Sequence, residues 1–247
     1  MPVKAVLFDL GNTLWHIPDP PPQQEVRNET VRRILELLRS WGVEVTDQHR
    51  FLGRDIRLAI TAADRKAYET DCVSPDFTKL VHDIAAGHGL EVRPEQAEEL
   101  WETWNLGGAF FGRVLFDDAL TTLDELRRRG YKLACVTNRA FSGRGFVAEL
   151  EEHGLAGVFD ALSVSCDVGY MKPHPQIFEH ALDLLDVAPS EAIMVGDSLR
   201  ADVEGARALG MTGVWRRYAR SPERVDGIKP DFAVDELGEI PQLRCFD

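Results

Sequence analysis

The stretch that decides the fold of this chain is VKAVLFDLGNTL, residues 3–14. Its apolar run is short, ends at Asp9 and is followed by a Gly-Asn turn, which is the pattern of a buried strand bounded by turn formers. A carboxylate at the carboxyl end of a strand stands where open α/β sheets bind their ligands. Asp9 is therefore a candidate functional residue, although an Asp in this position also commonly caps a turn.

The composition is that of an acidic globular protein. The chain has 247 residues, of which 44% are hydrophobic and 28% charged, and its formal net charge is −13. This length allows one large domain or a domain with an inserted partner. The negative charge argues against nucleic acid and anionic membranes as partners. A phosphorylated substrate stays compatible, because a bound metal ion can supply positive charge locally.

The cysteine pattern and the N-terminal sequence predict a cytoplasmic protein. The four cysteines form no CxxC pair and no disulfide framework. The first residues lead straight into a short strand, without the pattern of a signal peptide. No apolar run approaches the length of a membrane-spanning helix. We therefore expect reduced cysteines and no membrane partner.

Residues 16–115 are predicted to form an inserted, all-helical unit. A proline-rich connector, HIPDPPP at residues 16–22, leaves the first strand and cannot be helix interior. Apolar residues at helical spacing follow, with Asn28 as the expected N-cap of the first helix. No strand is expected between Trp15 and Phe116. The expected helices span residues 28–41, 47–69, 76–86 and 94–104.

Beyond residue 116, helices alternate with short apolar strands. The expected strands are 132–136, 161–164, 192–195 and 213–215, and the expected helices are 117–129, 145–152, 175–185 and 201–209. Such alternation is typical of right-handed βαβ units in a parallel, doubly wound sheet. The first strand has the same apolar character and is expected in this sheet. Residues 1–15 and 116–247 are thus predicted to form one α/β core domain, which the helical unit interrupts.

Chemically matched residues follow four of the expected strands. Because parallel strands bring their carboxyl ends to one edge of a sheet, we expect these side chains to lie together. In chain order they are Asp9, Thr137 with Asn138, Lys172, and Asp197 with Asp202.

The residue types in this set favour phosphoryl transfer. Carboxylates without a Cys or His cluster suit Mg²⁺, which prefers oxygen ligands. A carboxylate nucleophile forms an acyl phosphate and so divides hydrolysis into two steps. A metal ion and a lysine would offset the repulsion between that carboxylate and phosphate, while a hydroxyl and backbone N–H groups would hold the phosphate oxygens.

Four segments together resemble the motifs of the haloacid dehalogenase-like (HAD) hydrolase superfamily, in the form that carries a helical cap after the first strand. FDLGNTL at residues 8–14 is similar to the first motif, and VTN at residues 136–138 is similar to the second. KP at residues 172–173 is similar to the third, and VGDS at residues 195–198, with Asp202, to the fourth. The resemblance covers nearly the whole core domain and implies a Rossmann-like fold.

The resemblance also implies a role for each matched residue. Asp9 would be the nucleophile and a Mg²⁺ ligand, with the Gly11 carbonyl and Asp197 as further ligands. Asp202 would support the metal shell or pair with Lys172. The transferring phosphate would be held by Thr137, Asn138 and Lys172. The expected protein is a Mg²⁺-dependent phosphatase of a small phosphorylated metabolite, which hydrolyses a phosphoric monoester or an acyl phosphate.

Gly11 departs from the pattern of the phosphatases in that superfamily, which usually have a second Asp two residues after the nucleophile. That Asp protonates the leaving group and then activates water, and such help is worth about 10²–10⁴-fold. Three interpretations are open. In the first, the substrate has a good leaving group, as an acyl phosphate does. In the second, a cap residue or water replaces the Asp, and His16 is the nearest titratable residue. In the third, the protein binds phosphate with little or no catalysis and has an interaction or regulatory role.

Other reactions of the resembled superfamily are weaker alternatives. A 2-haloacid dehalogenase also lacks the second Asp and uses no metal, but Asp197 and Asp202 favour a metal-dependent enzyme. Phosphonate cleavage would need a cap lysine such as Lys66 or Lys79. A phospho-acceptor signalling module would not need the large helical insertion. That insertion is expected to act as a lid over a cleft. The residues expected to line the cleft are Trp15, His16, Phe110, Phe111 and Arg113.

Overall fold

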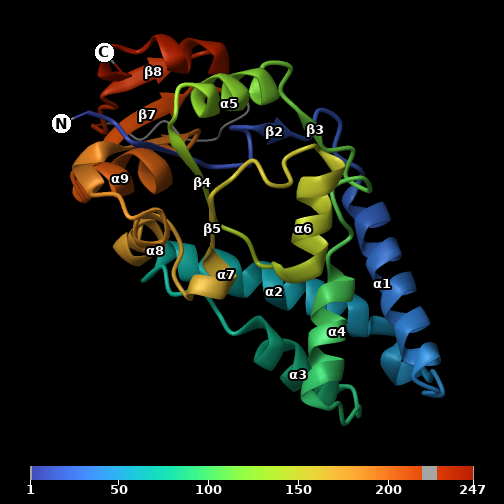
Figure 1. The fold of residues 1–247 in the computed structure, drawn as a ribbon. Helices are drawn as coiled ribbons and strands as arrows, with labels where there is room; N and C mark the ends of the chain where they lie inside the picture. Colours follow the sequence, from blue (N-terminus) through green and yellow to red (C-terminus); the bar gives the residue numbers. More distant parts are fainter. Residues whose placement is uncertain (1, 219–226, 247) are drawn as a thin grey trace.

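A six-stranded sheet, whose paired strands all run parallel, organises the computed structural model, which describes residues 2–218 and 227–246 (Figure 1). The spatial order of the strands is β5-β4-β1-β6-β7-β8. Their bounds are β1 Ala5–Phe8, β4 Lys132–Thr137, β5 Ala161–Val164, β6 Ala192–Gly196, β7 Thr212–Arg216 and β8 Phe232–Val234. The predicted α/β doubly wound sheet is confirmed.

β1 lies at the point where the strand order reverses. It pairs with β4 on one side and β6 on the other, so that Phe8 stands beside Cys135 and Val195. In open α/β sheets the crevice beyond the carboxyl ends of such strands is where ligands bind. The apolar run of residues 5–8 is completely buried, because helices cover both faces of the strand.

Two helical layers sandwich the sheet. Val6 and Phe8 of β1 pack with helices α5 (Ala119–Arg128) and α6 (Gly143–Glu152). Ala5 and Leu7 point to the other face and pack with α8 (Pro175–Leu185) and α9 (Gly205–Ala208). Because side chains alternate along a strand, a shift of one residue in β1 would exchange its contacts with the two layers.

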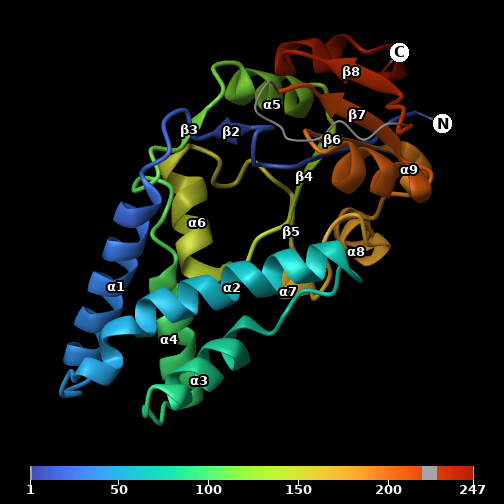
Figure 2. The same ribbon diagram turned by 180° about the vertical axis from the view of Figure 1, so that it is seen from behind.

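Residues 16–115 contain four α-helices that share an apolar core of their own. They are α1 Gln23–Ser40, α2 Leu52–Glu69, α3 Phe77–Gly87 and α4 Pro94–Trp104, and a 3-10 helix, Asp47–Phe51, precedes α2. Figures 1 and 2 show these helices together, to one side of the sheet. Buried residues such as Ile34, Ile60 and Leu100 join them. This helical group follows the predicted pattern, including the start of α4 at Pro94.

Two expectations for the segment between residues 15 and 116 are wrong. Short strands do occur there: β2 (Trp15–His16) pairs with β3 (Val114–Leu115) as an antiparallel ribbon. Two-residue strands carry too few positions to show a periodic pattern. In addition, Asn28 is not the N-cap of the first helix, because α1 begins at Gln23, directly after Pro22. The side chain of Asn28 instead accepts a hydrogen bond from Gln24 within the helix.

Several elements near the end of the chain differ from the sequence pattern. The expected helix 201–209 is a π-helical turn, Leu199–Glu204, followed by α9. A short helix, α7 (Ser165–Val168), strand β8 and two 3-10 helices, Leu237–Gln242 and Arg244–Phe246, were not expected. Among the described residues, no helix is long and apolar enough to cross a membrane.

Helix α8 carries a buried and an exposed leucine, which together test its packing against the sheet. Leu182 is 3% exposed and packs in the layer that covers β1, whereas Leu184 on the same helix is 58% exposed. Leu182→Ala is expected to lower the free energy of unfolding by about 2–5 kcal/mol, through lost burial and the cavity left behind. Leu184→Ala is expected to change it by about 0.5 kcal/mol or less. Urea denaturation of both variants measures the difference, and equal losses would contradict the described packing.

Candidate active site

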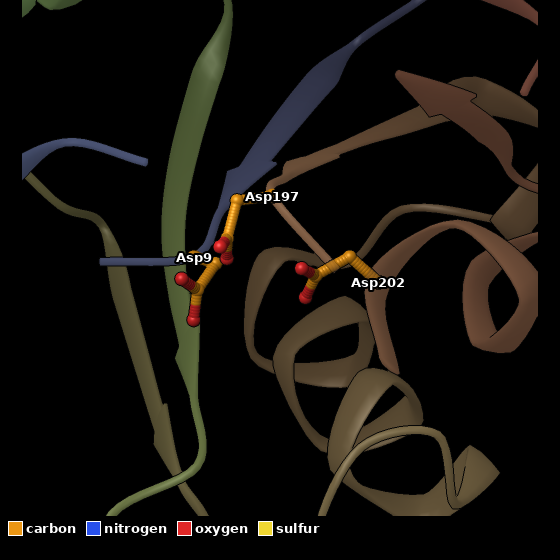
Figure 3. A group of neighbouring side chains, drawn as sticks. All are labelled: Asp9, Asp197 and Asp202. Carbon is orange, nitrogen blue, oxygen red and sulfur yellow. The ribbon is translucent and has the colours of Figure 1, made fainter. Parts of the chain in front are cut away.

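Three carboxylates meet at the carboxyl edge of the sheet. Asp9 follows β1, and its N–H donates to the Val195 carbonyl of β6 at 2.9 Å. Asp197 follows β6, and Asp202 lies in the π-helical turn that comes next. Figure 3 shows the three side chains gathered beside the end of β1. One oxygen of each lies within 4.8 Å of the others.

Lys172 holds two of these carboxylates. Its Nζ donates to Asp9 Oδ1, to Asp202 Oδ1 and to the Val136 carbonyl, each at 2.7 Å. An ammonium has three donors, so all three are used. Burial acts to lower the pKa of Lys172, but attraction by Asp202 and Asp9 outweighs it and raises the pKa. Lys172 is therefore charged and, at 2% exposure, closed off from solvent.

Both carboxylate oxygens of Asp202 accept hydrogen bonds from the protein. Its Oδ1 accepts the bond from Lys172, and its Oδ2 accepts one from the Ser198 N–H at 2.9 Å. Burial, together with the negative charges of Asp9 and Asp197, raises the pKa of Asp202, although attraction by Lys172 opposes this. Of the two roles expected for Asp202, the structure contains the pairing with Lys172.

Asn138 is directed at the loop that carries Lys172. The Asn138 Nδ2 donates to the Lys172 carbonyl at 2.9 Å, and its Oδ1 accepts from the Lys172 N–H at 2.7 Å. Both ends of this amide are engaged with the backbone of Lys172. The side chain that was expected to bind phosphate thus positions the lysine that neutralises Asp9.

The donor set fits a hard divalent cation. Asp9 and Asp197 provide carboxylate oxygens, which Mg²⁺ prefers, and Asp202 lies close behind with both oxygens already bonded. Asn12 Nδ2 donates to Asp197 Oδ2 at 3.3 Å, and Thr13 Oγ1 donates to Asp9 Oδ2 at 3.3 Å. Such secondary hydrogen bonds orient the carboxylates of metal sites.

A cavity of about 420 Å³ lies in front of Asp9. The core lines it with Asp9, Gly11 and Thr137, and the helical segment lines it with Asp64 of α2 and Trp104 of α4. The cavity is therefore bounded by both parts of the chain. Gly11 leaves room at its edge, because a Cβ added there would meet nothing within 4 Å.

Two of the five residues expected in the cleft line this cavity, namely Trp15 and Arg113. His16 does not line it; its ring stacks on Phe116, with centroids 4.4 Å apart, and its Nδ1 bonds the hydroxyl of Tyr218 at 2.9 Å. Phe110 and Phe111 pack edge to face against each other and are also absent from the lining. The lysines considered for phosphonate cleavage, Lys66 and Lys79, do not line the cavity either.

A buried ion cluster forms one wall of the cavity. Glu149 Oε2 accepts from Arg113 Nη1 at 2.7 Å and from Arg139 Nη2 at 2.6 Å. The two guanidinium groups stack near Trp15, and Arg139 also lies 4.1 Å from the centroid of Phe141. Burial lowers the pKa of Arg139, and Glu149 opposes this. Arg139 directly follows Thr137 and Asn138. This position after a strand end is the sequence feature that could have indicated Arg139 as a residue of the cavity wall.

The cavity also collects buried polar atoms that lack a hydrogen-bond partner. Within residues 2–218 and 227–246, three such atoms belong to lining residues: Asp64 Oδ1, Trp104 Nε1 and Arg139 Nε. A fourth is Glu149 Oε1, on the carboxylate between the two arginines. Buried polar groups are nearly always paired, so each unpaired group needs an explanation, such as a catalytic role or a bound ion or water. Asp64 and Trp104 were missed from the sequence because nothing in a helical pattern shows which face meets another unit.

Comparison with known proteins agrees with this geometry. The haloacid dehalogenase-like hydrolase family matches residues 3–210, and the chain belongs to that family. A phosphoserine phosphatase of Thermus thermophilus is 38% identical over 156 residues, 60% of this chain and 57% of that protein. A ribulose-1,5-bisphosphate 5-phosphatase of Halopiger xanaduensis is 30% identical over 247 residues, 97% of this chain and 98% of that protein.

Solved structures share the fold along nearly the full chain. A HAD phosphatase from Thermococcus onnurineus is 28% identical, with 97% of each chain covered and a TM-score of 0.58. A 2-haloacid dehalogenase from Pseudomonas syringae is 22% identical, with 97% of each chain covered and a TM-score of 0.60. The second likeness concerns the fold alone.

The ion cluster in the cavity wall can be tested on helix α6. Glu149 is 3% exposed between two arginines, and Glu151 on the same helix is exposed. Glu149→Gln is expected to lower the free energy of unfolding by about 3–5 kcal/mol, because it leaves buried guanidinium charge without a counter-ion. Glu151→Gln is expected to leave it within about 0.5 kcal/mol. Chemical denaturation gives both free energies of unfolding. A Glu149→Gln variant as stable as the wild-type protein would contradict the described ion cluster.

Proposed function

We propose that this protein is a Mg²⁺-dependent phosphatase of small phosphorylated metabolites, which works through an aspartyl-phosphate on Asp9. The observation that carries the proposal is the group formed by Asp9, Asp197, Asp202 and Lys172 at the carboxyl edge of the sheet. The similarity to curated phosphatases, one of them along nearly the whole chain, supports the same conclusion.

The proposed reaction begins with Asp9. Its carboxylate faces the cavity and attacks the phosphorus, which displaces the leaving group and forms an acyl phosphate; water then hydrolyses this intermediate. Lys172 balances the charge of Asp9, so that the nucleophile repels an incoming phosphate less. Thr137, at the end of β4, lines the cavity and offers its hydroxyl to a phosphate oxygen.

Asp9, Asp197 and the carbonyl of Gly11 would hold the Mg²⁺ ion. When bound, the ion supplies positive charge beside the transferring phosphate. Asp202 would contribute from behind, by keeping Lys172 in place beside Asp9.

Residues 16–115 would act as a cap on a core formed by residues 1–15 and 116–247. The support is the separate apolar core of helices α1–α4 and the position of Asp64 and Trp104 on the cavity wall. A cap in this position excludes water and contacts the variable part of the substrate. Arg113 and Arg139 on the same wall suit a substrate that carries negative charge.

Replacement of the nucleophile gives the direct test. Asp9→Asn is expected to reduce phosphate release from acetyl phosphate and p-nitrophenyl phosphate by at least about a thousandfold, because the amide does not form the acyl phosphate. Asp183→Asn, an exposed change on α8, is the control and is expected to keep wild-type activity. Turnover that survives in Asp9→Asn would refute the mechanism. Metal-independent chloride release from 2-chloropropionate would instead favour a dehalogenase.

The metal assignment has its own test, which needs no turnover. Asp197→Asn is expected to weaken Mg²⁺ binding by at least about tenfold in isothermal titration calorimetry, because one anionic ligand is lost. Asp186→Asn, a change in a loop after α8, is the comparison and is expected to leave the affinity unchanged. Equal Mg²⁺ affinity of the wild-type protein and Asp197→Asn would show that the ion binds elsewhere or not at all.

A further inference from the structure

Asp64 is the carboxyl group that the helical insertion presents to the cavity of Asp9. It lies in α2, and its Oδ1 is buried without a hydrogen-bond partner. Among the residues that line the cavity in the described part of the chain, Asp9 and Asp64 are the two acids. An unpaired buried carboxyl oxygen is costly, and the fold retains it where a ligand would lie.

The proposed reaction requires a proton donor in this cavity. When the bond between phosphorus and the ester oxygen breaks, an alkoxide or phenolate leaves and needs a proton unless it is already a stable anion. Asp9 is committed as the nucleophile. Guanidinium groups such as those of Arg113 and Arg139 donate hydrogen bonds rather than protons. Gly11 has no side chain, and none of the described lining residues is a His, Cys, Tyr, Lys or Glu. Asp64 is the group that remains.

The surroundings of Asp64 favour its protonated form. Burial raises the pKa of this carboxyl, because removal from water penalises the charged state. Asp9, Arg113 and Arg139 line the same cavity, and burial is the cause of this shift. A carboxyl group that is protonated before substrate binds can act as an acid.

We propose that Asp64 of the helical insertion donates the proton to the leaving group and then accepts a proton from the attacking water. The inference rests on the proposed function. In the first step Asp9 forms a bond to phosphorus, the bond from phosphorus to the ester oxygen breaks, and the Asp64 proton passes to that oxygen. In the second step the Asp64 carboxylate takes a proton from water as the water oxygen bonds to phosphorus and the bond to Asp9 breaks. Asp64 is thereby protonated again, and inorganic phosphate leaves.

Leaving-group dependence tests this role. Asp64→Asn keeps the size of the side chain but supplies no acidic proton. For phenyl phosphate, kcat/KM is expected to fall about 10²–10⁴-fold. For p-nitrophenyl phosphate the loss is expected to be at least about tenfold smaller, since p-nitrophenolate leaves without a proton. Glu69→Gln, an exposed change on the same helix, is the control and is expected to leave kcat/KM for both esters unchanged. Equal losses for both esters, or no loss for either, would overturn the proposal.

A second variant separates a chemical role for Asp64 from a structural one. Gly11→Asp places a carboxyl group at the open cavity edge, where a Cβ meets nothing. In the Asp64→Asn background Gly11→Asp is expected to raise kcat/KM for phenyl phosphate at least tenfold. In the wild-type background the same change is expected to raise kcat/KM much less. An equal gain in both backgrounds would mean that the wild-type protein lacks an acid, and would overturn the proposal. Failure of the proposed function would give a different result from failure of this inference. In that case the wild-type protein would release no phosphate from either ester in an Asp9-dependent manner.

Discussion

The burial of the Lys172 ammonium between two carboxylates is the constraint on which the site depends. Its three partners lie directly after β1, at the end of β4 and in the turn after β6, so that one side chain joins segments that are far apart in sequence. Taking charges out of water is expensive, and the removal of one partner leaves an uncompensated charge. The strand ends must therefore keep their register for Lys172 to be satisfied. Asn138 fixes the backbone of the lysine and completes this arrangement.

Two ion clusters of opposite net charge contribute residues to the cavity wall. At the strand ends three carboxylates gather and two of them bond the ammonium of Lys172, whereas in the second cluster two guanidinium groups bond the carboxylate of Glu149. Arg113 directly precedes β3, at the boundary of the helical insertion, and Arg139 belongs to the core. An anion in the cavity would thus meet the positive charges of Arg113 and Arg139, and this second cluster also connects the two parts of the chain.

The sequence was most informative where chemistry and local pattern coincide. The strands were predicted closely, because an all-apolar run that ends at Asp9, Thr137 or Gly196 leaves few alternatives in an α/β chain. The same strand ends supplied the residues of the site. The start of α1 was missed because Gln23 and its neighbours show no apolar period, and β8 because three residues carry little pattern. The partners of Asn138 and the position of Asp64 depend on how segments that are distant in sequence pack together. A local sequence pattern carries no information about such packing.

The ribbon of β2 and β3 gives the helical insertion a modular character. The chain leaves the core at Trp15 and returns at Leu115, and these two residues are directly paired. The Leu14 carbonyl also accepts a bond from the Phe116 N–H at 3.0 Å, so that the two crossings remain adjacent on the core side. A segment joined at this point can change in length or sequence without altering the order or register of the sheet. Changes among helices α1–α4 can therefore be accommodated without disturbing the strand ends where Asp9 and Asp197 lie.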